Sequence, residues 1–301
     1  MTLFVGLDSM WHHSVKSLLA IGESQGSRNG ETLEILGYMG QLRFPGRCWL
    51  TNERRCLSPF MAAAEALWYM SGESDVKAML PFAPQYIKYA EDDGHANGAY
   101  GRRMFRLDFD RLEAAVSALR SDPDSRRVVV PLWHAADLVD GHGPNAKRDV
   151  PCTISIHFMI RDSALHMFVH MRSQDVWLGM PYDVFWNCTL MHVIAAELGV
   201  AIGTYTHYCD SLHLYDKHRA AAVEAVQRYP MNSDLVWAPV GQTIKGMREA
   251  GEKFVKPACM RYGCGLIADE LLRVTEAFVI DLPIDNRVLK QAALLYTEKK
   301  R

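Results

Sequence analysis

The spacing of apolar residues predicts a β-sheet in the middle of the chain. Apolar side chains occupy every second position over 154–158 and again over 165–171, and Asp162-Ser163 between these segments is typical of a tight turn. The same period of two recurs over 205–209, and we expect another strand over 126–130.

Three segments have the pattern of helices. Ser58 followed by Pro59 is a typical helix start, and the apolar run that they open ends at Ser71-Gly72. Over 110–119, apolar residues recur at the spacing of one helical face, and 183–198 is mostly apolar. A sheet covered by such helices predicts an α+β fold, and because no linker or repeat divides the chain, we expect one domain over 1–301.

Composition narrows the class of protein. The 301 residues carry 33 Lys+Arg against 35 Asp+Glu, a net charge of −2, so a general nucleic-acid binder is not expected. Seven scattered cysteines predict a reduced protein without a zinc site. The start of the sequence has no export pattern, and no segment is apolar enough to cross a membrane. We therefore expect a cytoplasmic protein without a metal.

Cys152 is a candidate nucleophile. A free cysteine is most often a small buried apolar residue, so a structural role is the ordinary alternative. However, Cys152 lies where a charged loop enters a strand, and cationic neighbours favour the reactive thiolate. The sequence offers four such cations nearby, namely Arg126, Arg127, Arg148 and Arg172.

Two carboxylates are candidates for proton transfer or recognition. Glu65 is the only charged residue in 60–70, where it must lie beside the buried face of its helix, and burial would raise its pKa. A solvated position at the edge of the helix is the alternative. Asp183 lies in the first turn of its helix, where a carboxylate can simply cap free amides.

Polar side chains at two strand ends complete the candidate site. Arg172-Ser173 could be a surface pair but also suits an oxyanion or phosphate. His213 and Tyr215 point to the same face of a strand, as a site that grips a hydroxylated ligand requires.

Taken in order, these residues resemble the thymidylate synthase superfamily over roughly 15–220. The run Arg-Ser-x-Asp-x-x-Leu-Gly-x-Pro, which begins at Arg172, is highly specific, whereas Pro151-Cys152 alone is weak. The other matches are Arg28-Asn29-Gly30, Glu65 in Glu-Ala-Leu-Trp, Tyr100-Gly101, Ser125-Arg126-Arg127 and His213-Leu214-Tyr215. Residues 221–301 match nothing that can be assigned individually. The resemblance implies a thymidylate synthase-like fold with a mostly antiparallel or mixed sheet, through which two copies form a homodimer.

The resemblance also implies a role for each residue. Cys152 would add to C6 of a pyrimidine mononucleotide, and C5 would then attack the one-carbon unit of 5,10-methylenetetrahydrofolate. Glu65 would organise water and proton transfer. The 5′-phosphate would be held by Arg28, Arg172 and Ser173, together with Arg126 and Arg127 from the other subunit. The rest of the nucleotide would contact Tyr100 and Asp183, with His213 and Tyr215 at the 3′-hydroxyl. The folate would contact Asp175, Gly179 and Tyr182.

Departures from the family pattern point to a different substrate and product. Thymidylate synthases have Asn where this chain has Asp183, and Asn matches uracil; a carboxylate instead accepts from the amino group of cytosine. The same substitution marks the deoxycytidylate hydroxymethylases. Thr153 stands where histidine is common, and the chain ends without the usual apolar tail, so we expect a site that admits water.

The leading hypothesis is therefore a deoxycytidylate 5-hydroxymethyltransferase. The resemblance links such enzymes to modified cytosine in bacteriophage DNA. Three alternatives remain: a dCMP methyltransferase, a CMP hydroxymethylase and a thymidylate synthase-like enzyme acting on dUMP. A catalytically idle nucleotide-binding homologue is a further alternative, which the intact Cys152, Glu65 and arginine set disfavours. A cysteine hydrolase lacks any comparable ordered set of matches.

Overall fold

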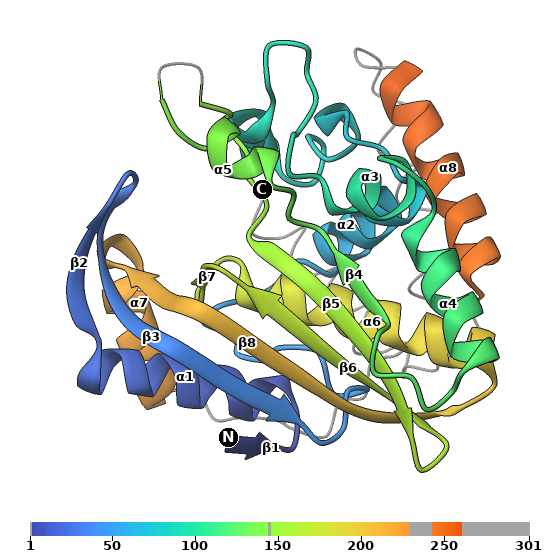
Figure 1. Ribbon diagram of the computed structural model, residues 1–301. Coiled ribbons are helices and arrows are strands. Elements are labelled where there is room, and N and C mark those ends of the chain that lie inside the picture. The colour runs from blue at the N-terminus through green and yellow to red at the C-terminus, as the bar shows by residue number, and fades with distance from the viewer. Residues whose placement is uncertain (1, 144–145, 229–242, 261–301) are drawn as a thin grey trace.

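The computed structural model describes residues 2–143, 146–228 and 243–260. Within them, eight strands form one mixed sheet that helices cover on one face (Figure 1), as the α+β prediction requires. The strand order is β1 (Thr2–Phe4), β3 (Gly30–Leu42), β8 (Ala201–Tyr215), β6 (Ala164–Met171), β5 (Thr153–Arg161) and β4 (Val129–Pro131), while β2 (Glu23–Ser27) pairs with β3 and β7 (Gln174–Asp175) pairs with β8.

The hairpin of β5 and β6 confirms the pattern of alternating residues. Asp162 and Ser163 have positive φ angles of 51° and 59°, the conformation of a two-residue turn that matches strand twist. In contrast, the strand expected over 126–130 begins only at Val129. The Val129 amide donates a 3.0 Å hydrogen bond to the carbonyl of Arg127, and this local turn keeps Arg126 and Arg127 out of the sheet.

A break in the sheet sets the orientation of the end of β8. The register with β3 passes from Leu36–Ser211 to Tyr38–Cys209 without pairing Gly37, whose φ is +71°. The register is the same on both sides of this unpaired position, but the alternation of buried side chains along β8 changes phase there. Consequently the buried positions change from odd to even numbers, and Leu212 and Leu214 are buried while His213 and Tyr215 stay half-exposed.

The predicted helices are present with small changes at their ends. Helix α2 (Pro59–Ser71) begins after Ser58, whose hydroxyl accepts a 3.2 Å hydrogen bond from the Met61 amide, and it ends at Gly72 with a φ of +71°. Helix α4 (Arg111–Ser121) buries the expected apolar face. Helix α6 (Met180–Leu198) begins three residues before the predicted start, because Pro181 is accommodated in its first turn.

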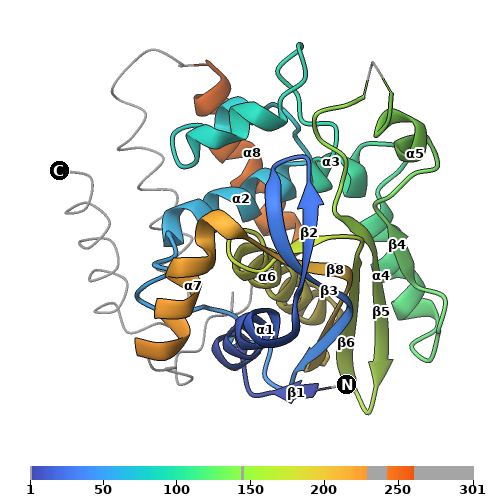
Figure 2. The same ribbon diagram turned by 90° about the vertical axis from the view of Figure 1, so that its left-hand side faces the viewer.

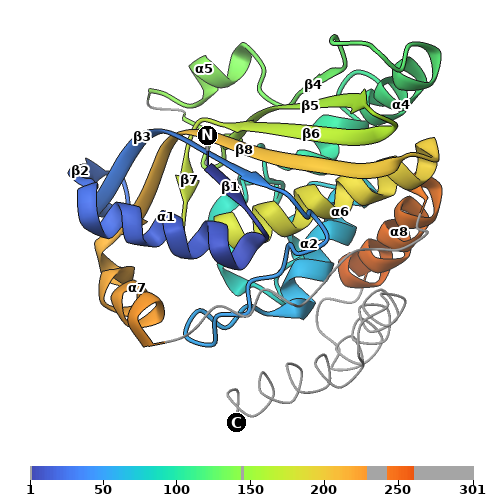
Figure 3. The same ribbon diagram turned by 90° about the horizontal axis from the view of Figure 1, so that it is seen from below.

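Most of the helices, namely α1 (Leu7–Ile21), α2, α6, α7 (Asp216–Arg228) and α8 (Ile244–Met260), lie on one side of the sheet (Figures 2 and 3), with α6 directly beneath β8 and β6 and α2 beyond α6. None of the described helices is long and apolar enough to cross a membrane. The other elements are α3 (Tyr100–Phe105), α5 (Ala136–Asp140) and two 3₁₀ segments, η1 (Val76–Ala78) and η2 (Pro84–Tyr89).

The other face of the sheet is not covered by any helix of the described chain (Figure 1). Leu36, Met39 and Val129 lie on this open face with 75%, 39% and 49% of their surface exposed. Phe168 and Tyr208, on neighbouring strands, are half-buried there. The open face therefore carries several exposed or half-exposed apolar side chains beside polar groups such as His170 and Asp210, which pair at 2.9 Å.

Candidate active site

Cys152 lies immediately before β5, against Arg172, which directly follows β6. The backbone amide of Arg172 donates a 2.8 Å hydrogen bond to the carbonyl of Cys152. The side chain of Arg172 donates to the carbonyls of Pro151 and Val150 at 3.0 and 2.9 Å, and its Nη2 lies 3.8 Å from Cys152 Sγ. Loop carbonyls thus hold the guanidinium beside the thiol.

The charges around Cys152 favour the neutral thiol. Burial raises its pKa to about 11, and Asp183, Asp149 and Asp175 act in the same direction, while Arg172 opposes them. Arg172 acts in the expected direction, toward the thiolate, but within the single chain burial and the carboxylates outweigh it. The physical reason is that one guanidinium faces several carboxylates and a desolvated pocket.

Three of the candidate arginines do not reach the thiol within one chain. In the antiparallel pair of β4 and β5, Val129 lies opposite His157, so Arg127 precedes the strand at its far end. At about 3.3 Å per residue, Arg127 is roughly 20 Å from Cys152 along the sheet. The side chain of Arg127 is 89% exposed, and Arg148 is paired with Asp92 at 2.6 Å.

Arg28 lies in the exposed turn between β2 and β3 (Figure 1), and Ser173 is half-buried next to Arg172.

Glu65 faces the interior of the site from α2. It is 7% exposed, and burial with help from Asp183 raises its pKa to about 8, while a hydrogen bond with Tyr69 lowers it. The hydroxyl of Tyr86 also donates to Glu65 Oε1. The prediction that Glu65 lies beside the buried face of its helix is confirmed, and the raised pKa favours the protonated form of its carboxyl group.

Asp183 does not cap its helix. Its Oδ2 accepts a 2.9 Å hydrogen bond from Gln174 Nε2, while Gly179 occupies the N-cap position of α6. Burial raises the pKa of Asp183 to about 6, against the lowering effect of Gln174. Gln174 is 2% exposed, and its Oε1 has no hydrogen-bond partner among the described residues. The carboxyl group is thus held by a side chain whose second polar atom is still unpaired.

The predicted folate residues lie around the start of α6. Asp175 Oδ1 accepts from the amides of Trp177 and Leu178 at 2.8 and 3.0 Å. The Tyr182 hydroxyl accepts a 3.0 Å hydrogen bond from the Ser58 amide, which ties α6 to the start of α2. A β-carbon at Gly179 would lie 2.9 Å from Gln174 Nε2, so a larger residue there would disturb the Gln174–Asp183 pair.

The remaining candidates lie at neighbouring strand and helix ends. The rings of His213 and Tyr215 meet edge to face at 5.2 Å, and Asp175 and Arg172 are close enough to act on the pKa of His213, which burial lowers. Tyr100 of α3 hydrogen-bonds to Thr153, and its pKa is raised well above the ordinary value by burial and by Asp183.

Five residues that the sequence did not single out also belong to this cluster. Asp149 accepts from the Gly98 amide at 2.8 Å, and its pKa is raised to about 6 by burial. Tyr89 lies close enough to Asp149, Cys152 and Glu65 for these groups to add to the effect of burial, which raises its pKa. The others are Tyr69, Tyr86 and Gln174. The available signals were the three-residue distance from Asp149 to Cys152 and the four-residue distance from Glu65 to Tyr69.

The site thus joins one thiol, one guanidinium, four carboxyl groups and several phenols. Among the described residues, no group of His, Cys, Asp and Glu is arranged to hold a metal ion. The arrangement can support addition of a thiol to an electron-poor ring, followed by proton transfers through buried carboxyl groups.

Comparisons with known proteins agree with this geometry. The sequence profile described as thymidylate synthase matches residues 9–248. The chain is 28% identical over 240 residues to the deoxyuridylate hydroxymethyltransferase of Bacillus phage SP01, a match that covers 75% of this chain and 62% of that protein. It is 25% identical over 224 residues to the thymidylate synthase of Buchnera aphidicola subsp. Baizongia pistaciae, covering 72% of this chain and 82% of that enzyme. The thymidylate synthase of Symbiobacterium thermophilum is 30% identical over 171 residues, covering 50% of this chain and 57% of the relative. The chain therefore belongs to the thymidylate synthase family, whose members are folate-dependent one-carbon transferases acting on nucleotides.

Proposed function

We propose that the protein is a deoxycytidylate 5-hydroxymethyltransferase that uses 5,10-methylenetetrahydrofolate and water and releases tetrahydrofolate. Membership of the family supports the folate-dependent one-carbon transfer. The name of the phage relative supports hydroxymethyl transfer as a reaction of this kind of chain. The observation that carries the substrate assignment is Asp183, held by Gln174 at the start of α6.

Asp183 suits the edge of cytosine. Its free carboxylate oxygen can accept from the C4 amino group, whereas an ionised carboxylate meets the acceptor O4 of uracil with no donor. Because the group is buried, an unmatched pair of acceptors costs about 1–3 kcal/mol, which corresponds to a discrimination of roughly five- to 150-fold. Discrimination should be strongest above the pKa of Asp183, which is about 6.

Cys152 is the proposed nucleophile. Its sulfur forms a bond to C6 of the pyrimidine as the thiol proton leaves, and the ring electrons move toward C5. C5 then bonds to the one-carbon unit. The proton on C5 is lost as the bond from the one-carbon unit to the folate nitrogen breaks, and the nitrogen departs as the protonated amine, which leaves an exocyclic methylene at C5. The oxygen of water adds to this methylene, the water proton passes to Glu65, and departure of the Cys152 thiolate from C6 restores the ring.

The thiol needs more positive charge than one chain supplies, because its pKa is raised to about 11. We propose that a second copy provides it through Arg126 and Arg127, which are exposed and too far from Cys152 in their own chain. The apolar open face of the sheet is the proposed dimer interface. With Arg28, Arg172 and Ser173, these arginines would hold the 5′-phosphate.

The other proposed contacts follow the arrangement of the site. His213 and Tyr215, whose rings meet at 5.2 Å, would bind the 3′-hydroxyl, and Tyr100 would line the nucleotide pocket. Asp175, Gly179 and Tyr182 would hold the folate. The carboxylate of Asp175 can accept from the amino and ring N–H groups of a pterin. It is half-buried at the end of β7, two residues before the aromatic Trp177.

A second candidate is hydroxymethyl transfer to dUMP. The name of the phage relative favours it. The raised pKa of Asp183 also allows a protonated carboxyl group, which could donate to O4 of uracil. This candidate predicts activity on dUMP that increases as the pH falls toward 6.

Product analysis tests the proposed function. The protein is incubated with methylenetetrahydrofolate and dCMP, dUMP or CMP in separate reactions, and the mass of each nucleotide product is determined by mass spectrometry. The Cys152→Ala variant is the control. We expect dCMP to gain one CH₂O unit and tetrahydrofolate to be released. A methyl product with dihydrofolate, preference for another nucleotide, or no Cys152-dependent product would contradict the proposal.

A further inference from the structure

The carboxyl group of Glu65 lies between two phenol hydroxyls. Tyr86, from the 3₁₀ segment η2, donates to Oε1. Tyr69, one helical turn after Glu65 on α2, hydrogen-bonds to the same carboxyl group. All three side chains are buried, with 7%, 9% and 8% of the surface of Glu65, Tyr86 and Tyr69 exposed. The two hydroxyls are therefore dedicated to this carboxyl group rather than to solvent.

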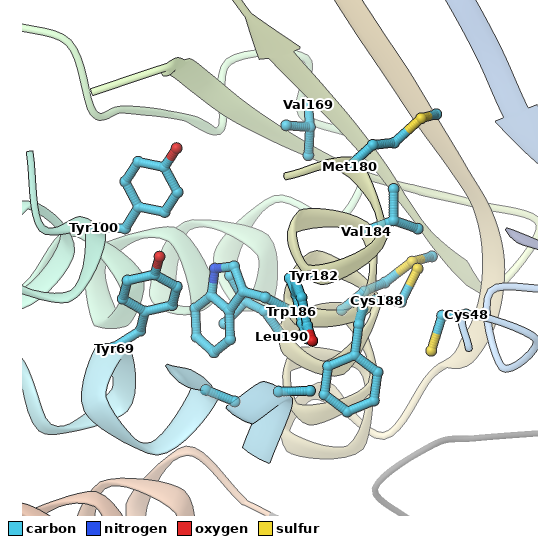
Figure 4. Close-up of a cluster of buried hydrophobic side chains, with 14 of the residues drawn as sticks. Cys48, Tyr69, Tyr100, Val169, Met180, Tyr182, Val184, Trp186, Cys188 and Leu190 are labelled. Atoms are coloured by element: carbon cyan, nitrogen blue, oxygen red, sulfur yellow. The ribbon is translucent and has the colours of Figure 1, made fainter. Parts of the chain in front are cut away.

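Aromatic packing fixes both phenol rings. The ring of Tyr86 meets Trp68 edge to face, with centroids 5.8 Å apart and an interplanar angle of 81°. Tyr69 packs against Trp186 at 5.1 Å and Tyr100 at 5.2 Å (Figure 4). Because neighbouring rings restrict rotation about the side-chain bonds, the hydroxyls stay aimed at Glu65. Such support is what a precisely oriented catalytic carboxylate requires.

We propose that Tyr69 and Tyr86 are positioning residues for Glu65, whose hydroxyls orient its carboxyl group and stabilise its ionised form as the base that accepts a proton from water. The inference rests on the proposed function, in which water adds to the exocyclic methylene. In that step the water oxygen bonds to the methylene carbon, one water proton moves to Glu65, and the π electrons of the methylene move into the ring.

The electrostatics of the pocket explain why two donors are needed. Burial and Asp183 on α6 both raise the pKa of Glu65, which stands at about 8. Tyr89 of η2 is also near enough for the charge of Glu65 to raise its pKa. Hydrogen bonds donated to the carboxylate favour its ionised form and oppose these effects. Removing one donor should therefore raise the pKa of Glu65 by about one unit, a tenfold change in its ionisation equilibrium.

A titration of Glu65 tests the inference without turnover. The full-length protein is labelled with ¹³C at glutamate carboxyl groups, and the Glu65 signal is identified by its absence in Glu65→Gln. Tyr69→Phe and Tyr86→Phe remove one hydroxyl each and retain the ring. Tyr38→Phe is the matched control, since it removes another buried hydroxyl, bonded to Ser14 at 2.8 Å.

We expect the midpoint of the Glu65 titration to rise by about one pH unit in Tyr69→Phe and in Tyr86→Phe, and to stay unchanged in Tyr38→Phe. The pH profile of hydroxymethyl product formation should shift to higher pH by the same amount as the Glu65 midpoint. An unchanged midpoint in a folded Tyr69 or Tyr86 variant would overturn the inference, and one folded variant suffices for this decision. If the midpoints rise but no variant or wild-type protein makes the product, the positioning of Glu65 stands and the proposed function fails.

Discussion

Gln174 Nε2 donates a 2.9 Å hydrogen bond to Asp183 Oδ2, and this bond joins the short strand β7 to the first turn of α6. The bond occupies one carboxylate oxygen and leaves the other for a ligand. It also stabilises the ionised form of Asp183, which burial disfavours. The hydrogen bond from Gln174 thus allows Asp183 to be buried as a carboxylate and still accept a hydrogen bond from the amino group of a base.

Replacing Gln174 by Met should weaken recognition of dCMP. Met has a similar volume but no donor, so Asp183 loses its hydrogen bond and its pKa rises further above the ordinary value. Since a hydrogen bond to a charged group contributes about 1.5–3 kcal/mol, kcat/KM for dCMP should fall roughly ten- to hundredfold. Gln41→Met, which removes a 2.9 Å bond to Thr206, is the control and should keep the dCMP to dUMP ratio. Equal ratios in both variants would show that Gln174 does not support Asp183.

Replacing Cys152 by Ser should abolish turnover but preserve nucleotide binding. A serine hydroxyl is far less ionised than a thiol, whereas Arg172 is held by backbone carbonyls that the substitution leaves in place. Product formation and equilibrium binding of dCMP are measured on the same preparation. Near-normal turnover would remove Cys152 from the mechanism.

Mixed dimers should restore activity to two inactive variants. A Cys152→Ala chain and an Arg126→Ala/Arg127→Ala chain can together form one site that has both the thiol and the partner's arginines. After subunit exchange, shown independently with two differently tagged chains, the mixture should approach about a quarter of wild-type activity. If exchange occurs and the mixture stays inactive, the arginines are not shared between subunits.

Stability should depend on pH through Glu65. Its pKa of about 8 in the folded protein exceeds the ordinary value of 4.5, so the folded state binds the proton more tightly. The resulting stabilisation is complete below the ordinary pKa and is lost as the pH rises through 8. From about pH 7 to pH 8.5, the wild type should lose roughly 1 kcal/mol more of its unfolding free energy than Glu65→Gln. The unfolding free energies are measured by urea denaturation. If they fall by the same amount in both proteins over this pH range, the pKa of Glu65 is not raised.

The local patterns of the sequence predicted individual elements well. The cap at Ser58 and the apolar face over 110–119 each depend on residues within one helix, and both are confirmed. The strand expected to start at Arg126 starts only at Val129, because a turn between Arg127 and Val129 competes with strand pairing. The phase change after Cys209 was also not predicted, and it coincides with the unpaired Gly37 of the neighbouring strand.

The candidate site was only partly predictable. Ordered motifs brought Cys152, Arg172 and Asp183 together, and the structure places these residues in one cluster. The contact of Tyr86 with Glu65 joins a 3₁₀ segment to a helix, and no periodic pattern marks such a pair. The effect of the arginines on the thiol depends on distances and desolvation, which sequence proximity does not provide. The ending of the chain, expected to leave the site less closed, lies outside the described residues.

The most direct test of the account is the ratio of kcat/KM for dCMP to kcat/KM for dUMP, measured for the wild type and for Asp183→Asn. The amide offers a donor for O4 and an acceptor for N3–H, so the variant should lose activity on dCMP and gain some on dUMP, a change in the ratio of about ten- to hundredfold or more. A role in capping α6 predicts no change, because Asn caps a helix about as well as Asp. An unchanged ratio in the folded variant would contradict the recognition of cytosine by Asp183, and with it the assignment of dCMP as the substrate.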